Sequence, residues 1–176
     1  MFFYLMEQFH IIPVHVITLV EDQKNPTLFL YCQGENKIIP VLIGLPEARI
    51  LALSLDKAIL DRPLTHNLLL NTIKAMGGEL TRVVIFDVID QTFYAKVCIK
   101  VGNEEVQVDA RPSDALILAV QSVRPIFVTD QVIKKAAQQS PVDRTAAQSE
   151  HALTPEEIEA LKKHLHEAQE REEKEG

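Results

Sequence analysis

The chain has 176 residues, of which 47% are hydrophobic and 24% charged, a composition typical of a globular protein with one main core. Its formal net charge of −7 excludes a protein that holds nucleic acid on a broad cationic surface. No stretch approaches the ~18 apolar residues of a membrane span. The apolar segment 1–6 lacks the basic region of a signal peptide, so we expect a cytoplasmic protein with no membrane contact.

The charge is unevenly distributed along the chain. Residues 138–176 contain 5 Lys and Arg against 10 Asp and Glu, whereas the preceding part is nearly balanced, with 13 against 15. The two cysteines, Cys32 and Cys98, each lie in an apolar stretch and lack the spacing of a metal site. We expect two buried thiols and a reducing compartment.

The first third of the chain is rich in β-branched residues and is interrupted by turn formers. Pro40 lacks an N–H group, which predicts that its strand either lies at an edge of the sheet or is bulged at this residue. The predicted strands form an antiparallel meander and cover residues 10–20, 27–32 and 37–43.

Two helices follow, at 46–60 and 65–76. Pro46 suits the first turn of a helix, and Gly77 with Gly78 is typical of a helix C-terminus. The apolar spacing of the second helix predicts that it buries Leu68, Leu69, Thr72, Ile73 and Met76.

The remaining elements before residue 138 are three strands, a buried helix, a short strand and an amphipathic turn. They are predicted at 81–88, 92–101, 105–109, 113–123, 125–128 and 132–137. The pattern indicates an α+β domain over residues 10–137, with antiparallel or mixed sheets packed against three or four helices.

The C-terminal part has a different character. Residues 138–153 lack periodicity and are predicted to be a linker, while Thr154, Pro155 and Glu157 predict the start of a charged helix over 154–176. Its apolar stripe is narrow and consists of Ile158, Leu161, Leu165 and Ala168. This helix is either solvated or docks with a protein partner or a second copy.

Two similar segments, 61–66 and 109–114, each place an acid before Arg-Pro and a hydroxyl residue at the start of a helix. Helix N-termini attract anions, and an adjacent arginine can fork onto phosphate oxygens. We therefore predict a phosphate-binding site from Arg62 and Arg111 together with Thr65 and Ser113. The alternative is structural, with the hydroxyl residues capping the helices and Asp61 and Asp109 neutralising the arginines.

Side chains able to move protons lie in the same segments. His66 is predicted to act as a base or acid, with Asp109 and Asp114 orienting water or binding a metal. Candidate ligands for a divalent cation, Mg²⁺ or Mn²⁺, are Asp109, Asp114 and Glu47, with Asp87 as a further contributor.

The string from Asp109 to Ala115, with 61–66, 44–48 and 93–95 upstream, resembles the bifunctional nuclease domain family of bacteria and plants. The resemblance extends over about residues 12–137. It implies a compact α+β fold, commonly assembled into homo-oligomers, and plant members are described as having DNase and RNase activity.

Three functions are consistent with these patterns. The leading hypothesis is a nuclease that hydrolyses phosphodiester bonds of DNA and RNA with little sequence specificity and holds its substrate locally at the Arg-Pro segments. The second is a non-catalytic regulatory or scaffold module that binds an anionic ligand or a protein partner. In the third, Arg62 or Arg111 pairs with an acid of a neighbouring subunit in an oligomer interface.

Overall fold

A computed structural model describes residues 11–20, 26–32 and 37–139. The chain divides into two compact units, 1–138 and 139–176. From residue 140 on, the predicted linker and charged helix lie outside the described residues, so they stay predictions. No helix in the described ranges is long and apolar enough to span a membrane.

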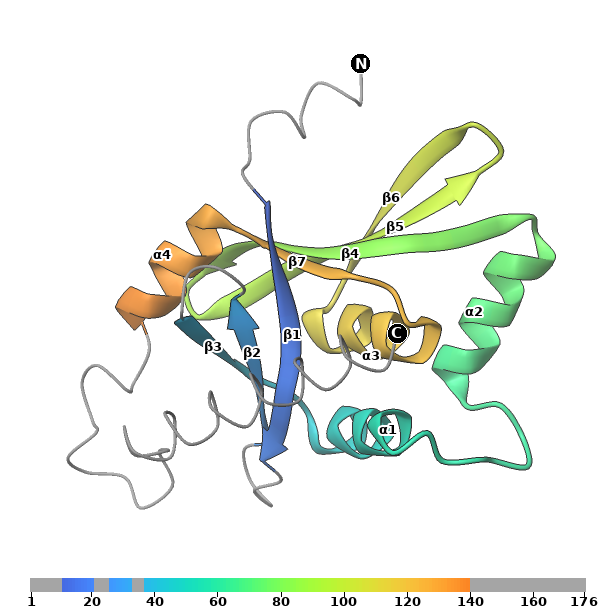
Figure 1. The fold of residues 1–176 in the computed structure, drawn as a ribbon, viewed down its shortest axis with the longest axis horizontal. Coiled ribbons are helices and arrows are strands. Elements are labelled where there is room, and N and C mark those ends of the chain that lie inside the picture. The colour runs from blue at the N-terminus through green and yellow to red at the C-terminus, as the bar shows by residue number, and fades with distance from the viewer. Residues whose placement is uncertain (1–10, 21–25, 33–36, 140–176) are drawn as a thin grey trace, which may run out of the picture. The chain divides into compact units, whose positions relative to one another are not determined.

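The first unit is built on one mixed sheet of seven strands in the order β3-β2-β1-β7-β4-β5-β6 (Figure 1). Two antiparallel meanders, β1 to β3 and β4 to β6, are joined through β7, which is antiparallel to β1 and parallel to β4. The strands are β1 (Ile11–Val20), β2 (Thr27–Cys32), β3 (Lys37–Leu42), β4 (Gly78–Ile89), β5 (Thr92–Val101), β6 (Glu104–Ala110) and β7 (Ile126–Thr129). The predicted α+β class and the first meander are confirmed.

Local turn chemistry explains where the strands reverse. Asp90 and Gln91 have φ angles of 47° and 63°, and Gly102 has 60°, the left-handed conformations that two-residue hairpins require. Pro40 lies on β3, an edge strand of the sheet, as its missing N–H predicts.

Four helices accompany the sheet: α1 (Leu45–Leu55), α2 (Thr65–Ala75), α3 (Pro112–Ser122) and α4 (Asp130–Gln139). Helix α1 ends five residues before the predicted boundary at residue 60. Lys57 is left-handed, with φ 50°, and the Ala58 N–H donates to the Leu53 carbonyl at 3.0 Å. This is the closing geometry in which glycine is usual, and a lysine there gave no stop signal.

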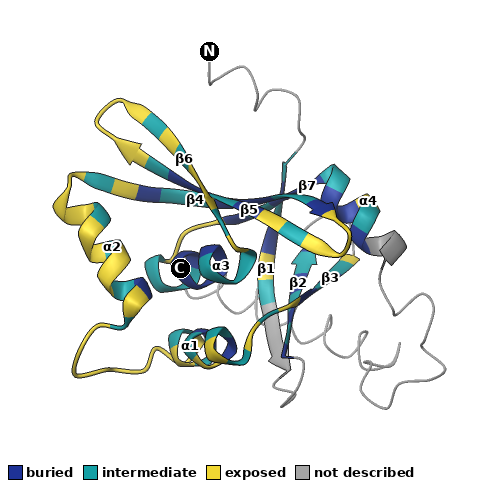
Figure 2. Ribbon diagram, turned by 180° about the vertical axis from the view of Figure 1, so that it is seen from behind, coloured by how far each residue is buried: buried dark blue, intermediate teal, exposed yellow. Residues whose placement is uncertain are grey.

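Helix α3 occupies the centre of the core. It packs against α1, α2, β4 and β5, and its five central residues, Ala115 to Ala119, are all buried (Figure 2). The thiols of Cys32 and Cys98 are also buried, as predicted.

Helix α2 contradicts the prediction that its apolar side chains are buried. Leu68 and Met76 are 58% and 78% exposed, Leu69 and Thr72 are exposed as well, and Ile73 is half-buried. Among the residues of α2, the buried one is His66, which is 8% exposed. The helix contacts α3 and β4 on one side, and no described element covers its outer side.

Candidate functional site

Three helices bring their N-terminal turns to one place. Glu47 is the third residue of α1, His66 the second of α2 and Asp114 the third of α3, while Arg111 immediately precedes α3. These four side chains are linked by hydrogen bonds and ion pairs, and we call them the three-helix junction. Because helix N-termini carry partial positive charge, the junction is a local centre of positive dipole ends.

Arg111 and Asp114 form the strongest link of the junction. The Arg111 Nε donates to Asp114 Oδ2 at 2.8 Å, and Nη2 donates to Oδ1 at 3.1 Å. Pro112 restricts the preceding residue to extended backbone, and Arg111 has φ −65° and ψ 143°. Such an extended residue can direct its side chain back over the first turn of α3.

Glu47 is the second carboxylate that Arg111 meets. Its Oε1 lies 2.8 Å from Arg111 Nη2, and its side chain is largely buried, whereas the side chain of Arg111 is 65% exposed. The acids that pair with Arg111 therefore belong to its own chain. Among the described residues, none accepts a hydrogen bond from Nη1.

His66 completes the junction from α2. Its Nε2 lies 3.0 Å from Asp114 Oδ1, and because a carboxylate can only accept, Nε2 carries the proton and donates. His66 is 8% exposed, and its Nδ1 has no hydrogen-bond partner among the described residues. The imidazole is thus largely buried and is held through Nε2 by Asp114.

The charges of the junction stabilise one another. Burial raises the pKa of Asp114, but hydrogen bonds and charge from Arg111 and His66 outweigh it and hold this pKa below its ordinary value. The hydrogen bond and charge of Asp114, followed by those of Glu47, raise the pKa of Arg111. At neutral pH Asp114 is therefore a carboxylate that is paired with the Arg111 guanidinium.

Thr65 and Ser113 do not cap their helices, and the expectation that these hydroxyl residues are N-caps is corrected. The N-cap positions belong to Leu64 and Arg111, and neither Thr65 nor Ser113 occupies one. At α2 the Leu64 N–H donates to Asn67 Oδ1 at 3.2 Å, so an amide three residues into the helix satisfies this backbone group. Thr65 and Ser113 each adjoin a junction residue in the chain.

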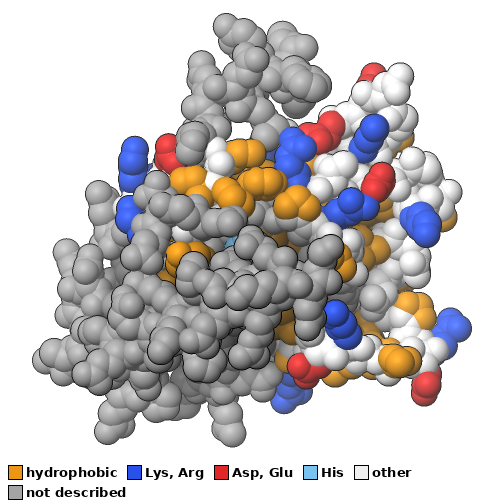
Figure 3. All heavy atoms as spheres, in the orientation of Figure 1, with side chains coloured by type: hydrophobic (Ala, Val, Ile, Leu, Met, Phe, Trp, Pro, Cys, Tyr) orange, Lys and Arg blue, Asp and Glu red, His pale blue; other side chains and the backbone are white. Residues whose placement is uncertain are grey.

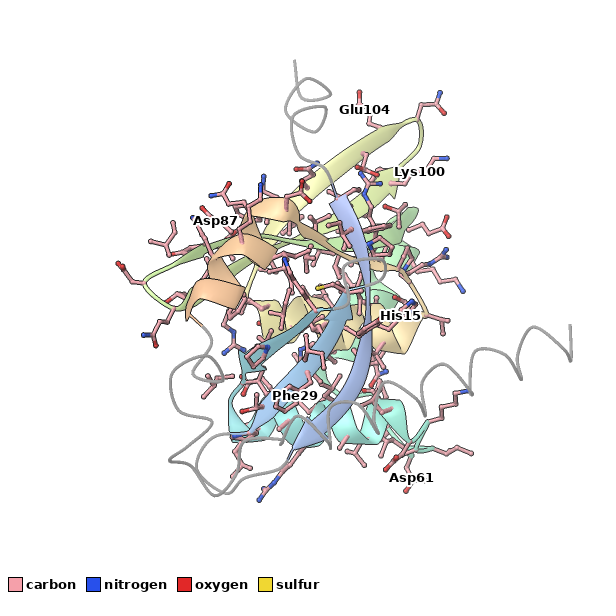
Figure 4. The ribbon with its side chains drawn as sticks, turned by 60° about the vertical axis from the view of Figure 1, so that its left-hand side comes forward. His15, Phe29, Asp61, Asp87, Lys100 and Glu104 are labelled. Carbon is pink, nitrogen blue, oxygen red and sulfur yellow. The ribbon has the colours of Figure 1, made fainter. Side chains whose placement is uncertain are left out.

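The first Arg-Pro segment contributes only His66. Asp61 and Arg62 are exposed in the loop between α1 and α2, where neither makes a hydrogen bond or ion pair with a described residue (Figure 4). The near-duplicated segments are therefore not equivalent. His66 of the first contacts Asp114 of the second, and Asp114 also accepts hydrogen bonds from Arg111.

Asp109 lies apart from the junction. Its neighbour Ala110 packs on the core, and because side chains alternate along a strand, Asp109 points to the other face of the sheet. Its partner across the ladder is Lys96. Asp87 is also elsewhere, beside α4, where its Oδ1 accepts from Lys135 Nζ at 2.6 Å (Figure 4).

The donor set does not match a resident divalent cation. Among residues 11–20, 26–32 and 37–139, no group of three or more His, Cys, Asp or Glu side chains is placed to hold a metal. The carboxylates of Glu47 and Asp114 converge on Arg111, whose guanidinium stands where a cation would have to lie.

The link between Glu47 and Arg111 was missed by sequence reasoning, which considered Glu47 only as a metal ligand. An acid in the first turn of a helix is a common feature that favours the helix dipole, so it carries no signal of a distant partner. The structural alternative in the sequence analysis paired Arg111 with Asp109, and this is corrected: the partner of Arg111 is Asp114, three residues further along the chain.

Comparisons with known proteins agree with the family resemblance of the sequence. The model of the family described as Bifunctional nuclease domain matches residues 28–141. The chain therefore belongs to the bifunctional nuclease domain family.

Two kinds of relatives are similar to the chain. An uncharacterized protein of Mycobacterium tuberculosis (strain H37Rv) is 32% identical over 149 residues, which covers 85% of this chain and 88% of that protein. Bifunctional nuclease 1 of Oryza sativa subsp. japonica and Bifunctional nuclease of Oryza minuta are each 26% identical over 102 residues, 56% of this chain and 31% of theirs.

Proposed function

We propose that the protein is a nuclease that hydrolyses phosphodiester bonds of DNA and RNA with little sequence preference, and that the three-helix junction is its site. Family membership and the names of the rice relatives support this reaction class. The observation that carries the assignment to the junction is the Arg111 side chain, which is anchored by Asp114 but 65% exposed. An anchored, outward-facing guanidinium suits a phosphate oxygen.

Each junction residue has a distinct role in this proposal. Arg111 binds the phosphate and stabilises the charge that develops on it during attack by water. Asp114, which remains partly exposed, orients that water as a hydrogen-bond acceptor. His66 is buried and donates to Asp114, so we assign it a positioning role in place of the acid-base role first expected.

The other residues that the sequence predicted for the site have no assigned step in the reaction. Thr65 and Ser113 offer hydroxyl and backbone N–H groups next to the junction, and Arg62 offers an exposed second cation on the adjacent loop. Asp109 and a divalent cation have no assigned step, so cleavage is to be measured with Mg²⁺, with Mn²⁺ and with a chelator.

The test is cleavage of single-stranded DNA and RNA by the purified full chain and its Arg111→Ala variant. We expect Arg111→Ala to lower the rate by about 10²-fold or more, the usual effect of removing a group that stabilises a developing oxyanion. Arg124→Ala is the matched control, because Arg124 is an exposed arginine paired with Glu79 just beyond the opposite end of α3. Equal rates for the two variants would contradict the assignment of the nuclease site to the three-helix junction.

A second candidate function is a regulatory or scaffold module that binds an anionic ligand without turnover. Two observations favour it: the histidine of the junction is buried, and the lowered pKa of Asp114 makes this carboxylate a weaker base. Tight binding of a nucleotide or oligonucleotide with no product, under all three metal conditions, would support this module over the nuclease.

The proposal also includes self-association through α2. Its outer side exposes Leu68, Leu69 and Met76, a cluster that a second copy of the chain would cover. Sedimentation equilibrium of the full chain and of Leu69→Glu tests this, with a smaller mass expected for the variant. A monomeric wild type would remove self-association from the proposal and leave the charged C-terminal segment as the candidate for a protein partner.

A further inference from the structure

The guanidinium of Arg111 has only one edge left for a phosphate. Its side edge, formed by Nε and Nη2, is taken by both oxygens of Asp114. Nη2 has a second hydrogen on the end edge, and Glu47 Oε1 lies 2.8 Å from this nitrogen. A phosphate that accepts two hydrogen bonds from the end edge of Arg111 needs both a hydrogen of Nη1 and this second hydrogen of Nη2.

Glu47 reaches this position because residue 44 has no side chain. A Cβ built on Gly44 would lie 2.2 Å from Glu47 Oε2 and 3.2 Å from Glu47 Cδ. The backbone of Gly44 has φ −69° and ψ 152°, an extended conformation that alanine adopts without strain. The space beside Gly44 therefore serves the Glu47 carboxylate, and no backbone requirement explains the glycine.

We propose that Glu47, which lies in the space beside Gly44, occupies the position of an anion on the end edge of Arg111 in the ligand-free protein. A phosphate that accepts two hydrogen bonds from this edge must displace the Glu47 carboxylate. This inference rests on the proposed function of the junction and adds a specificity-determining pair to it. Asp114 keeps hold of Arg111 through the side edge during the exchange. Glu47 thus lowers affinity for anions and limits the site to ligands that compete with a buried carboxylate.

The experiment is a double-mutant cycle read by calorimetric binding of inorganic phosphate, and of a short single-stranded oligonucleotide, at low ionic strength. Glu47→Ala removes the competing carboxylate, and Gly44→Ala pushes it off Arg111 without straining the backbone. We expect each to tighten phosphate binding, by roughly tenfold for Glu47→Ala. The double variant should bind no more tightly than Glu47→Ala alone, since Gly44→Ala then has no carboxylate to displace.

Unchanged or weaker binding in both single variants would overturn the inference, as would a further effect of Gly44→Ala in the Glu47→Ala background. Glu47→Gln, which keeps the size and removes the charge, replaces Glu47→Ala if the latter unfolds. Arg111→Ala separates the two proposals. If it leaves phosphate binding intact, the junction is not the anion site; if it abolishes binding while Glu47→Ala has no effect, only the role of Glu47 fails.

Discussion

Asp114 is the acceptor that holds the junction together at the scale of single residues. It accepts two hydrogen bonds from Arg111 and one from His66, and so connects the first turns of α2 and α3. Hydrogen bonds to a charged group contribute more than neutral ones, and their loss leaves the partners unpaired. His66 is buried, so loss of Asp114 would leave its imidazole without a hydrogen-bond partner among the described residues.

Replacing Asp114 by Asn should lower the free energy of unfolding by about 1–3 kcal/mol at neutral pH. Although burial raises the pKa of Asp114, Arg111 and His66 lower it overall. A group with a lowered folded-state pKa stabilises fully above its unfolded pKa of about 4, and this contribution is lost as pH falls through the folded value. Urea unfolding of both proteins between about pH 7 and 3 checks this. A stability difference that does not shrink below about pH 4 would contradict it.

The cysteines give a second prediction at this scale. Burial raises the pKa of the Cys98 thiol, and Cys32 is also buried, so neither presents a reactive thiolate. A thiol reagent should label neither cysteine in the native protein and both in denaturant. Rapid labelling of Cys98 in native conditions would show that β5 opens far more readily than its place inside the sheet implies.

Among the elements, α2 and α3 have the same length but opposite surroundings. Helix α3 is buried on several sides because it fills the space between α1, α2 and the sheet, whereas α2 lies against α3 and β4 on one side only. Both helices begin at the junction, so α2 is held at its first turn by His66 while its outer leucines remain exposed.

Matched leucine truncations should separate the two helices. Leu116→Ala in α3 removes a side chain that is fully buried and should lower the free energy of unfolding by about 2–5 kcal/mol. Leu68→Ala in α2, at 58% exposure, should change it by no more than about 0.5 kcal/mol. Chemical denaturation of both variants is the measurement. A large loss in Leu68→Ala would mean that a second copy of the chain covers α2 in solution.

The whole molecule is acidic, with a formal charge of −7, and its basic side chains are dispersed. On the face shown in Figure 3, Lys and Arg side chains of the described residues stand singly among acidic and apolar ones. The described residues on this face form no continuous track for a phosphate backbone, so we expect binding to depend on the few cations near the junction.

Salt dependence of oligonucleotide binding tests this local mode. Each phosphate contact adds about 0.7 to the magnitude of the slope of log K against log salt for a single strand, so one or two contacts give a slope of roughly −0.7 to −1.4. Fluorescence anisotropy of the full chain between about 20 and 200 mM salt is the measurement. A slope several times steeper would mean that a cationic surface other than Arg111 and Arg62 takes part.

Local chemistry determined the strands, the turns and most helix boundaries of the first unit. Alternation of side chains, the missing N–H of Pro40 and the left-handed turn at Gly102 act within a few residues, so the sequence by itself revealed them. The same local logic failed at Lys57, where a residue other than glycine closes α1, and on α2, where an apolar spacing did not imply burial.

Only the tertiary structure decided which polar residues meet. His66 and Asp114 are 48 positions apart, and their contact depends on how α2 and α3 pack, which no local pattern encodes. The sequence by itself determined the Arg-Pro segments and the family; the packing of three helix N-termini selected Glu47, His66, Arg111 and Asp114 as one cluster and left Arg62 and Asp109 outside it. Residues that share a site are chosen by the packing of distant elements, whereas residues that share a turn are chosen by their neighbours in the chain.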